Sequence, residues 1–372
     1  MKISNAVLHV DAAGDAIRST NDTDSSLGYV LLDHSTAVLT AGEDRIQAQT
    51  TLQVDGGNYQ LVCGKGHTAT AVAASSAKGL KAKGSVLISD GTFVLDCCDD
   101  AIHAGELVRI AGGSFEISTA DDGIHASDIA EIQGGNIYVP VCYEGIEGAT
   151  VRISGGEISI VSDDDGITAA GGVDSSGMAG RPDAFFASDN YAIEISGGVL
   201  QVNARGDGLD SNGSLAISGG TVYVSASIDS GNGALDYDST GIITGGTVIA
   251  AGAGGMAMNF SDAQQQGSVL LNFSISSTEA VTLYDAQGNE LLQYTPPKQY
   301  SSALISCPAL QQGQTYTITA GSQTQTLILD TLLMGNGAAG AGILGRMHPG
   351  NEEENKGGTK ARALMMHFGA FC

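Results

Sequence analysis

The sequence is poor in basic residues, in proline and in large aromatic side chains. It has no tryptophan, 6 prolines, and 16 lysines and arginines against 41 acidic residues, which gives a formal net charge of −25 at pH 7. A field of this sign repels nucleic acid and anionic membrane surfaces, and it attracts cations. We therefore expect no nucleic-acid partner and no insertion into a membrane.

Long hydrophobic runs and cysteines in C-x-x-C spacing are also missing. No stretch of 18 apolar residues occurs, and the opening "MKISNAVLHVD" lacks the apolar core of a signal peptide. The 6 cysteines include no C-x-x-C pair, which argues against zinc and against a disulfide scaffold.

A short acidic motif recurs at a nearly constant interval. "DDGIHA" (121–126) follows "DDAIHA" (99–104) and precedes "YEGIEG" (143–148), "DDGITA" (164–169) and "GDGLDS" (206–211). The second acids, Asp100, Asp122, Glu144 and Asp165, are 22, 22 and 21 residues apart, and Asp207 comes 42 residues later. A fixed period of this size predicts a solenoid whose repeats are stacked coils.

Each repeat centres on a glycine that serves as its reference position. These reference glycines are Gly57, Gly91, Gly113, Gly135, Gly156, Gly198, Gly220 and Gly246. Aliphatic residues alternate on both sides of the glycine and return at the "DGI" segment, which predicts three short strands per coil. The predicted fold is therefore all-β, a right-handed parallel β-helix with coils of about 21–22 residues and a small C-terminal β module.

The periodicity divides the chain into three regions. Residues 1–260 are predicted to form the β-helix, residues 261–333 a C-terminal β module of alternating strands, and residues 334–372 a disordered tail. Insertions at 64–76 and 171–190 lengthen two coils. The coil pattern is already running at Met1, so we expect that N-terminal coils are missing from this chain.

Acidic residues recur at positions that the alternation predicts to point outward. Carboxylates one coil apart lie about 4.8 Å from each other and repel by about 1 kcal/mol even in water. A calcium ion shared between coils removes this conflict, so calcium is the expected cofactor. The expected ligands are Asp99, Asp100, Asp121, Asp122, Glu144, Glu147, Asp164, Asp165, Asp207, Asp210 and Asp236.

Within that set, Asp122 is expected to share ions with Asp100 and Glu144, while Asp165, Asp207 and Asp210 form a second cluster. The alternative is that the "DG" pairs are ordinary turn residues.

Four other residues at outward positions are candidates for contact with sugar. Tyr138 and Tyr223 stand three residues after their reference glycines, and His103 and His125 stand twelve after theirs. The histidine pair also leaves a transition-metal site open, although no third nitrogen or sulfur ligand accompanies it.

Two cysteines share an inward column six residues after the reference glycine. Cys63 and Cys97 are followed in that column by Thr119, Val141 and Ser162. Adjacent coils bring the two Cα atoms within disulfide range, but we expect buried free thiols, because in-register side chains rarely offer the required dihedral.

The motifs in order resemble a bacterial family of secreted carbohydrate-binding-domain proteins. The resemblance rests on "GDAIRSTNDTDSSLGY", "DDAIHA", "DDGIHASD", "YEGIEGATVRISGGEI", "GDGLDSNGSLAISGGTV" and "YTPPKQYSS", and it covers roughly residues 3 to 330. It implies a right-handed parallel β-helix related in shape to polysaccharide lyases, calcium-dependent binding of cellulose or pectin-type acids, and an extracellular or cell-surface location.

Three functions are compared on this basis. The first is calcium-stabilised binding of plant cell-wall polysaccharide by a monomer, without catalysis. The second is a polysaccharide lyase acting on polygalacturonate, with Lys78 or Lys81 as the base that removes the C5 proton. The third is a structural adhesin in which the coils are only a spacer.

Overall fold

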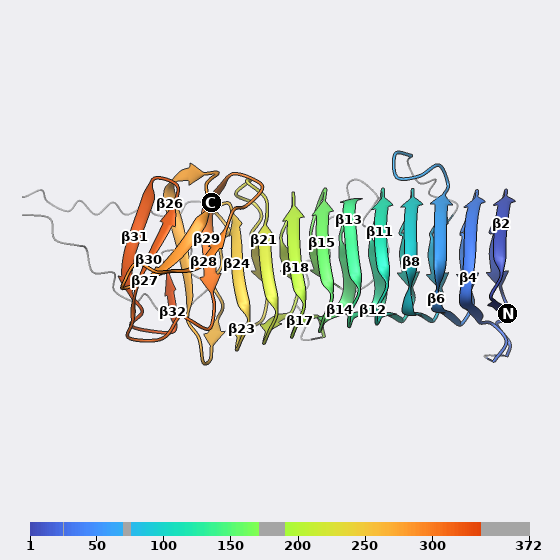
Figure 1. Ribbon diagram of the computed structural model, residues 1–372, viewed down its shortest axis with the longest axis horizontal. Helices are drawn as coiled ribbons and strands as arrows, with labels where there is room; N and C mark the ends of the chain where they lie inside the picture. Colours follow the sequence, from blue (N-terminus) through green and yellow to red (C-terminus); the bar gives the residue numbers. More distant parts are fainter. Residues whose placement is uncertain (25, 70–75, 171–189, 336–372) are drawn as a thin grey trace, which may run out of the picture.

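The structure is a computed structural model, and it describes residues 1–24, 26–69, 76–170 and 190–335. Every regular element in these ranges is a β-strand, so the expected all-β class is confirmed. One sheet contains 28 strands, and a second sheet contains four. Figure 1 shows the strands of the large sheet side by side from β2 (Val7–Ala12) at one end to β24 (Thr247–Gly252) at the other.

The large sheet consists mainly of three ladders, each made of equivalent strands from successive coils. Ladder 1 precedes the reference glycine, and its separate strands are β1 (Lys2–Ser4), β10 (Leu107–Ile110), β17 (Ala192–Ile195), β20 (Ser214–Ile217), β23 (Gly241–Ile243) and β25 (Asp262–Ala263). Ladder 2 follows the glycine and contains β2, β11 (Ser114–Thr119), β13 (Asn136–Cys142), β15 (Glu157–Ser162), β18 (Val199–Ala204), β21 (Thr221–Ser225) and β24.

Ladder 3 carries the "DGI" segments. It contains β3 (Ile17–Ser19), β5 (Ile46–Ala48), β7 (Leu80–Ala82), β9 (Ile102–Ala104), β16 (Ile167–Ala169), β19 (Leu209–Ser211) and β22 (Leu235–Tyr237). Five long strands take part in two ladders each: β4 (Val30–Ala41), β6 (Thr51–Cys63), β8 (Ser85–Cys97), β12 (Ile124–Ile132) and β14 (Ile146–Ile153).

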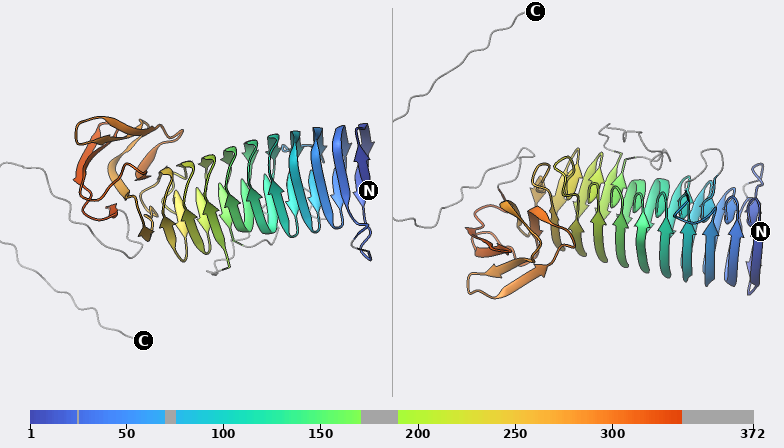
Figure 2. Two further views of the ribbon diagram at one scale, coloured as in Figure 1. Left: turned by 60° about the horizontal axis from the view of Figure 1, so that its bottom comes forward. Right: turned by 90° about the horizontal axis from the view of Figure 1, so that it is seen from above.

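Each coil pairs in parallel with the next in the predicted register. In ladder 1, Ile110 lies opposite Ile132, which lies opposite Ile153. In ladder 3, Ile102 lies opposite Ile124, which lies opposite Ile146. The chain therefore advances by one strand position in all three ladders with every repeat, as Figure 2 shows from two further sides.

The reference glycines are required by the corner between ladders 1 and 2. Gly135 has a φ of 98° and Gly156 a φ of 94°, a region that side chains with a Cβ rarely adopt. A Cβ built on Gly156 would also lie 2.9 Å from the carbonyl oxygen of Gly135 in the preceding coil. Any larger residue would separate the coils at this corner.

One apolar core runs through the coils. Its columns are mostly aliphatic, and in one of them Tyr59, Phe93 and Phe115 stack on one another with ring centroids 5.1 and 4.5 Å apart. These rings come from consecutive coils, so the stack joins three coils through side-chain contact as well as backbone pairing.

The expectation for Val141 is wrong. A register shift between Val139 and Cys142 places Val141 outward, 39% exposed, and puts Cys142 in the inward column at 2% exposed. Pro140, which cannot donate to the ladder, lies within the shift. The inward column therefore continues through Cys142 rather than Val141.

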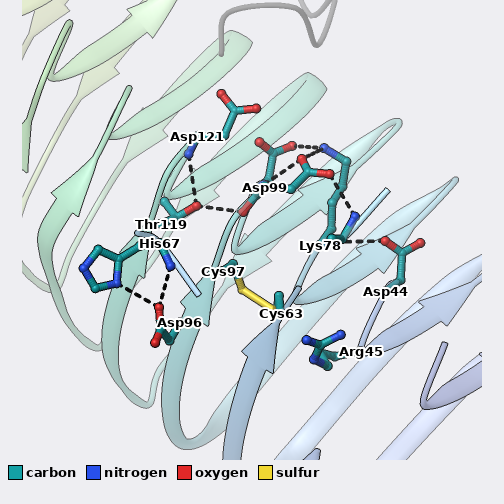
Figure 3. Close-up of a disulfide and its surroundings, with 12 residues drawn as sticks. Asp44, Arg45, Cys63, His67, Lys78, Asp96, Cys97, Asp99, Thr119 and Asp121 are labelled. Atoms are coloured by element: carbon teal, nitrogen blue, oxygen red, sulfur yellow. Dashed lines mark hydrogen bonds and ion pairs between the residues drawn. A yellow bond between two sulfur atoms is a disulfide. The ribbon is translucent and has the colours of Figure 1, made fainter. Parts of the chain in front are cut away.

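Cys63 and Cys97 lie opposite each other in β6 and β8, with their Cα atoms 4.3 Å apart, as the register predicts. They form a disulfide, which corrects the expectation of free thiols. Figure 3 shows this bond crossing between adjacent coils, close to Lys78 and Arg45.

The C-terminal module covers one end of the stack. β29 (Tyr300–Ser306) pairs antiparallel with β24 and with β26 (Ser268–Ser277), and β26 also pairs with β32 (Leu333–Gly335). The second sheet has the order β28 (Glu290–Tyr294), β27 (Val281–Asp285), β30 (Thr315–Ala320), β31 (Gln323–Ile328). Because β25 still pairs in parallel with β23, coil stacking continues to Ala263, slightly beyond the predicted boundary.

Several predicted features lie outside the described residues. They are residues 70–75 of the first insertion, residues 171–189 of the second, and the predicted tail from residue 336 onward. In the described part of the chain, no helix is long and apolar enough to cross a membrane.

Candidate functional site

The polar column predicted twelve residues after the reference glycine exists in ladder 3. Strand pairing places its members opposite one another in the order Arg18, Gln47, Lys81, His103, His125, Glu147, Thr168, Asp210 and Asp236. A second column stands nine residues after the reference glycines and lies on the turns that lead into these strands. Its members include Asp100, Asp122, Glu144, Asp165 and Asp207. The two columns run beside each other, and together they form the acidic ladder.

The central acids of the ladder are buried, whereas the alternation predicted outward side chains; Asp207, Asp210 and Asp236 are half-buried. Asp100 and Asp122 are 0% exposed and Glu144 is 2% exposed. The reason is hydrogen bonding along the stack. Asp100 Oδ1 accepts the backbone N–H of Asp122 at 3.3 Å, and Asp165 Oδ1 accepts that of Asp207 at 2.6 Å. The carboxylates therefore lie parallel to the stack and satisfy turn N–H groups of the next coil.

The N-terminal part of the ladder contains its own positive charges. Lys78 Nζ contacts Asp99 Oδ1 at 2.6 Å (Figure 3) and Asp100 Oδ2 at 2.5 Å. Lys81 Nζ contacts Asp44 Oδ2 at 2.9 Å. Burial alone would raise the pKa of Asp100, but Lys78 and the hydrogen bond from His103 hold that pKa well below its ordinary value. This segment is neutralised by side chains of the protein.

The two candidate lysines are consequently poor bases. Lys78 is 4% exposed and is hydrogen-bonded to two carboxylates, which favour its protonated form. Lys81 donates to Asp44 and to Ser76 Oγ at 2.7 Å. A base for the lyase reaction must be uncharged and must reach the substrate, and this geometry favours neither condition.

His125 is buried between two acids. It is 0% exposed, and its Nδ1 lies 3.2 Å from Asp122 Oδ2 and 2.6 Å from Glu147 Oε2. Burial lowers the pKa of His125, but the hydrogen bonds to Asp122 and Glu147 outweigh it and raise the pKa to about 12. His125 is therefore a fixed cation that partly neutralises this section of the ladder.

The histidine pair has a geometry that does not suit the roles considered for it. The rings of His103 and His125 are stacked, with centroids 4.8 Å apart and planes 7° from parallel. With Asp100 the two rings offer ligand atoms within 4.8 Å of one another, but Nδ1 of each ring is already hydrogen-bonded to a carboxylate. His125 is too buried to contact a polymer, and His103 Nδ1 is held 2.7 Å from Asp100 Oδ2.

The C-terminal part of the ladder concentrates carboxylates. Asp165, Asp207 and Asp210 offer oxygens within 4.8 Å of one another. Burial, followed by the charges of Asp210 and Asp207, raises the pKa of Asp165 well above its ordinary value. Burial and the charges of Asp122, Glu147 and Asp165 do the same to the pKa of Glu144.

One buried carboxylate oxygen beside this cluster is poorly satisfied by hydrogen bonds. Glu144 Oε2 is buried and makes no hydrogen bond of normal length in the described part of the chain, and Thr168 Oγ1, the polar neighbour that lowers the pKa of Glu144, also lacks one. A buried carboxylate oxygen without such a bond is costly, and a cation would satisfy it. We name Glu144, Asp165, Asp207 and Asp210 the carboxylate cluster.

The remaining expected ligands are distributed along the ladder. Asp99, Asp100 and Asp121 form one group, and Asp122, His125 and Glu147 form another. Asp164 lies on the turn beside Gly206, and burial with the charge of Asp238 raises the pKa of Asp236. Lys78 and His125 supply positive charge to the first two groups, whereas the carboxylate cluster consists of acids alone.

The two candidate tyrosines differ in their surroundings. Tyr138 is 47% exposed on the outer face of ladder 2. Tyr223 is stacked on Tyr294 of β28, with ring centroids 4.7 Å apart and planes 6° from parallel. One face of Tyr223 is thus covered by the C-terminal module. This contact could not be predicted from the sequence, because the two residues are far apart in the chain.

A protein-family comparison matches the N-terminal part of the stack. A family model described as "Carbohydrate-binding domain-containing protein" matches residues 1–123 and 106–184, just under half of the 372-residue chain. The match supports a carbohydrate-binding family. It covers Lys78, Lys81, His103 and His125 and ends before Asp207 and Asp210. No curated protein and no solved structure matches the chain.

Proposed function

We propose that this protein is a secreted or cell-surface, calcium-stabilised β-helix that binds an extended plant cell-wall polysaccharide without cleaving it. The family match supports the polysaccharide partner. The parallel pairing of coil with coil supports a β-helix, and a right-handed stack agrees with the preferred chirality of parallel crossovers.

The poorly satisfied oxygen of Glu144 is the observation that supports a bound cation most directly. Calcium prefers several oxygen ligands and takes carboxylates readily, which fits Asp165, Asp207 and Asp210, whose oxygens lie within 4.8 Å of one another. Glu144 adjoins them through its charge interaction with Asp165. Glu144, Asp165, Asp207 and Asp210 would hold the ion. It would supply the positive charge that Lys78 and His125 supply to the earlier coils.

The outer face of ladder 2 suits an extended polymer. Strand pairing places Glu116, Tyr138, Ser159 and Gln201 next to one another on four successive strands. Four strands about 4.8 Å apart extend over roughly 14 Å, and the exposed ring of Tyr138 offers a stacking surface within this polar row.

Two alternatives remain with less support. Lyase activity needs an uncharged base, and both candidate lysines are ion-paired to acids. A purely structural adhesin would not need to collect uncompensated carboxylates in one part of the stack.

An array of neutral and acidic plant polysaccharides, probed in calcium and in chelator, tests the proposal. We expect binding to at least one polymer and weaker binding in chelator. An absence of binding to every polymer in calcium would overturn the polysaccharide assignment. Equal binding in calcium and chelator would overturn the role of calcium alone.

A further inference from the structure

The C-terminal half of the described chain contains two basic side chains, and folding brings them together. Over residues 190–335 Arg205 and Lys298 are the only lysine or arginine, 93 residues apart. Lys298 Nζ donates a hydrogen bond to the carbonyl oxygen of Ala204, the residue before Arg205. In a protein of net charge −25, the juxtaposition of two like charges requires an explanation, because it is unfavourable on its own.

The pair lies in a corner between the stack and the C-terminal module. Arg205 follows β18 directly, and Lys298 belongs to the segment between β28 and β29. In the same corner Tyr294 of β28 stacks on Tyr223 of β21, the next strand of ladder 2 after β18. Ligand sites often form at such junctions between two structural units.

The two cations have little compensation from the protein. Arg205 Nη1 lies 3.0 Å from Asp163 Oδ1, but the two side chains are 75% and 62% exposed, so this ion pair is weak. Lys298 is half-buried, and burial together with the charge of Arg205 lowers its pKa to about 8. An anion between the two cations would relieve both effects.

We propose that Arg205 and Lys298 form a subsite for the carboxylate of an acidic sugar at the end of the ladder 2 face. This deepens the proposed function and rests on it, since it assigns one charged group of the polymer to two residues. Gln201 lies on the strand that ends beside Arg205, so the polar row with Tyr138 leads into the corner. The two tyrosines form the adjoining apolar wall, and the pair of cations selects for the acid.

The test uses hexagalacturonate, its methyl ester and cellohexaose as probes, with the full chain in constant calcium. The ester is the same oligomer without its charges. We expect wild type to bind hexagalacturonate about tenfold more tightly than the ester. Arg205→Gln and Lys298→Gln should each remove most of this difference and leave binding of the ester unchanged.

The matched control is Arg152→Gln. Arg152 is 45% exposed and pairs with Glu194 at 2.8 Å on ladder 1. The substitution therefore removes an equal charge from another face. It should retain the preference for the acid. Arg205 is exposed, so its variant remains informative even if the Lys298 variant loosens the module.

The outcomes separate the two levels of the proposal. Equal binding of acid and ester by wild type overturns the subsite and leaves polysaccharide binding intact. An unchanged preference in Arg205→Gln does the same. Failure of wild type to bind all three oligomers overturns the proposed function and the subsite together.

Discussion

Asp100 and Asp122 occupy equivalent positions in successive coils, and the side chain of the first accepts the backbone N–H of the second at 3.3 Å. The repeated acid therefore has a structural role that needs only one of its oxygens. The second oxygen decides what else the position does. In Asp100 it contacts Lys78, in Asp122 it lies 3.2 Å from His125 Nδ1, and Asp165 stands beside the carboxylates of Asp207 and Asp210.

Asp207→Asn tests the calcium site with little disturbance of the turn. Asp207 Oδ1 accepts the N–H of Gly233, and an asparagine keeps that acceptor while removing the charge. Saturating calcium should stabilise wild type by about 2.7 kcal/mol at a hundredfold excess over Kd, and the variant should lose most of this gain. Melting curves in calcium and in chelator measure it.

Glu279→Gln is the control for that experiment, because Glu279 is exposed and far from the ladder in sequence. Its calcium response should match that of wild type. Equal responses of the Asp207 variant and wild type would remove Asp207 from the site.

Lys78→Ala should destabilise the fold strongly. Removing one partner of a buried ion pair leaves uncompensated charge, which costs about 3–5 kcal/mol; Asp99 and Asp100 would both be left in that state. Denaturant unfolding of this variant against the exposed Lys83→Ala gives the difference. A loss equal to that of the control would show that the pair is not compensating the buried acids.

The lysines also bear on catalysis. We expect no calcium-dependent rise in unsaturated-uronate absorbance when wild type is mixed with polygalacturonate. A clear rise that disappears in Lys81→Ala, whose side chain is less buried than that of Lys78, would establish the lyase alternative.

The disulfide predicts a thiol count. The chain has 6 cysteines, and the bond between Cys63 and Cys97 uses two, so denatured, unreduced protein should react with four equivalents of a thiol reagent (6 − 2 = 4). Closing a loop of this length contributes about 4 kcal/mol in the chain-entropy account. Reduction should therefore lower the melting temperature, and six reactive thiols without reduction would contradict the bond.

Binding of hexagalacturonate should depend on pH through Lys298. Only the protonated amine attracts a carboxylate, and its pKa in the free protein is about 8. Affinity should be highest below pH 8 and should fall as the pH rises through that value, while binding of the methyl ester stays constant. Arg205 and Asp163 are the charged neighbours of the site. Titration calorimetry between pH 6 and pH 10 would show the slope.

Protonation of Lys298 should also make the free energy of unfolding depend on pH, and this dependence has the opposite sign to that of binding. The pKa of Lys298 in the folded protein lies below the value of about 10.4 in an unfolded chain. Between those two values the unfolded state binds more protons, so the contribution of Lys298 to the free energy of unfolding rises with pH.

The strands, the coil register and the order of the polar column could be predicted, because a period of two and a repeat of 21 or 22 residues fix which residues lie opposite one another. The burial of Asp100, Asp122 and Glu144 could not, because alternation gives the side of the strand and not the tilt of the side chain along the stack. The shift at Pro140 and the approach of Lys298 to Ala204 depend on local strain and on contacts between distant segments.

The disulfide and the ring stack of Tyr59, Phe93 and Phe115 lie within the same few coils, and this has a consequence for unfolding. A coil in such a stack touches only its neighbours, so coils can separate one at a time from an end. When order is lost from the first strands, the bond keeps Cys63 of β6 tethered to Cys97 of β8 and so limits the conformational freedom that β6 gains. The opposite end is held by the antiparallel pairing of β24 with β29. Backbone amides of the coils between the disulfide and β24 should exchange with deuterium more slowly than those before β6.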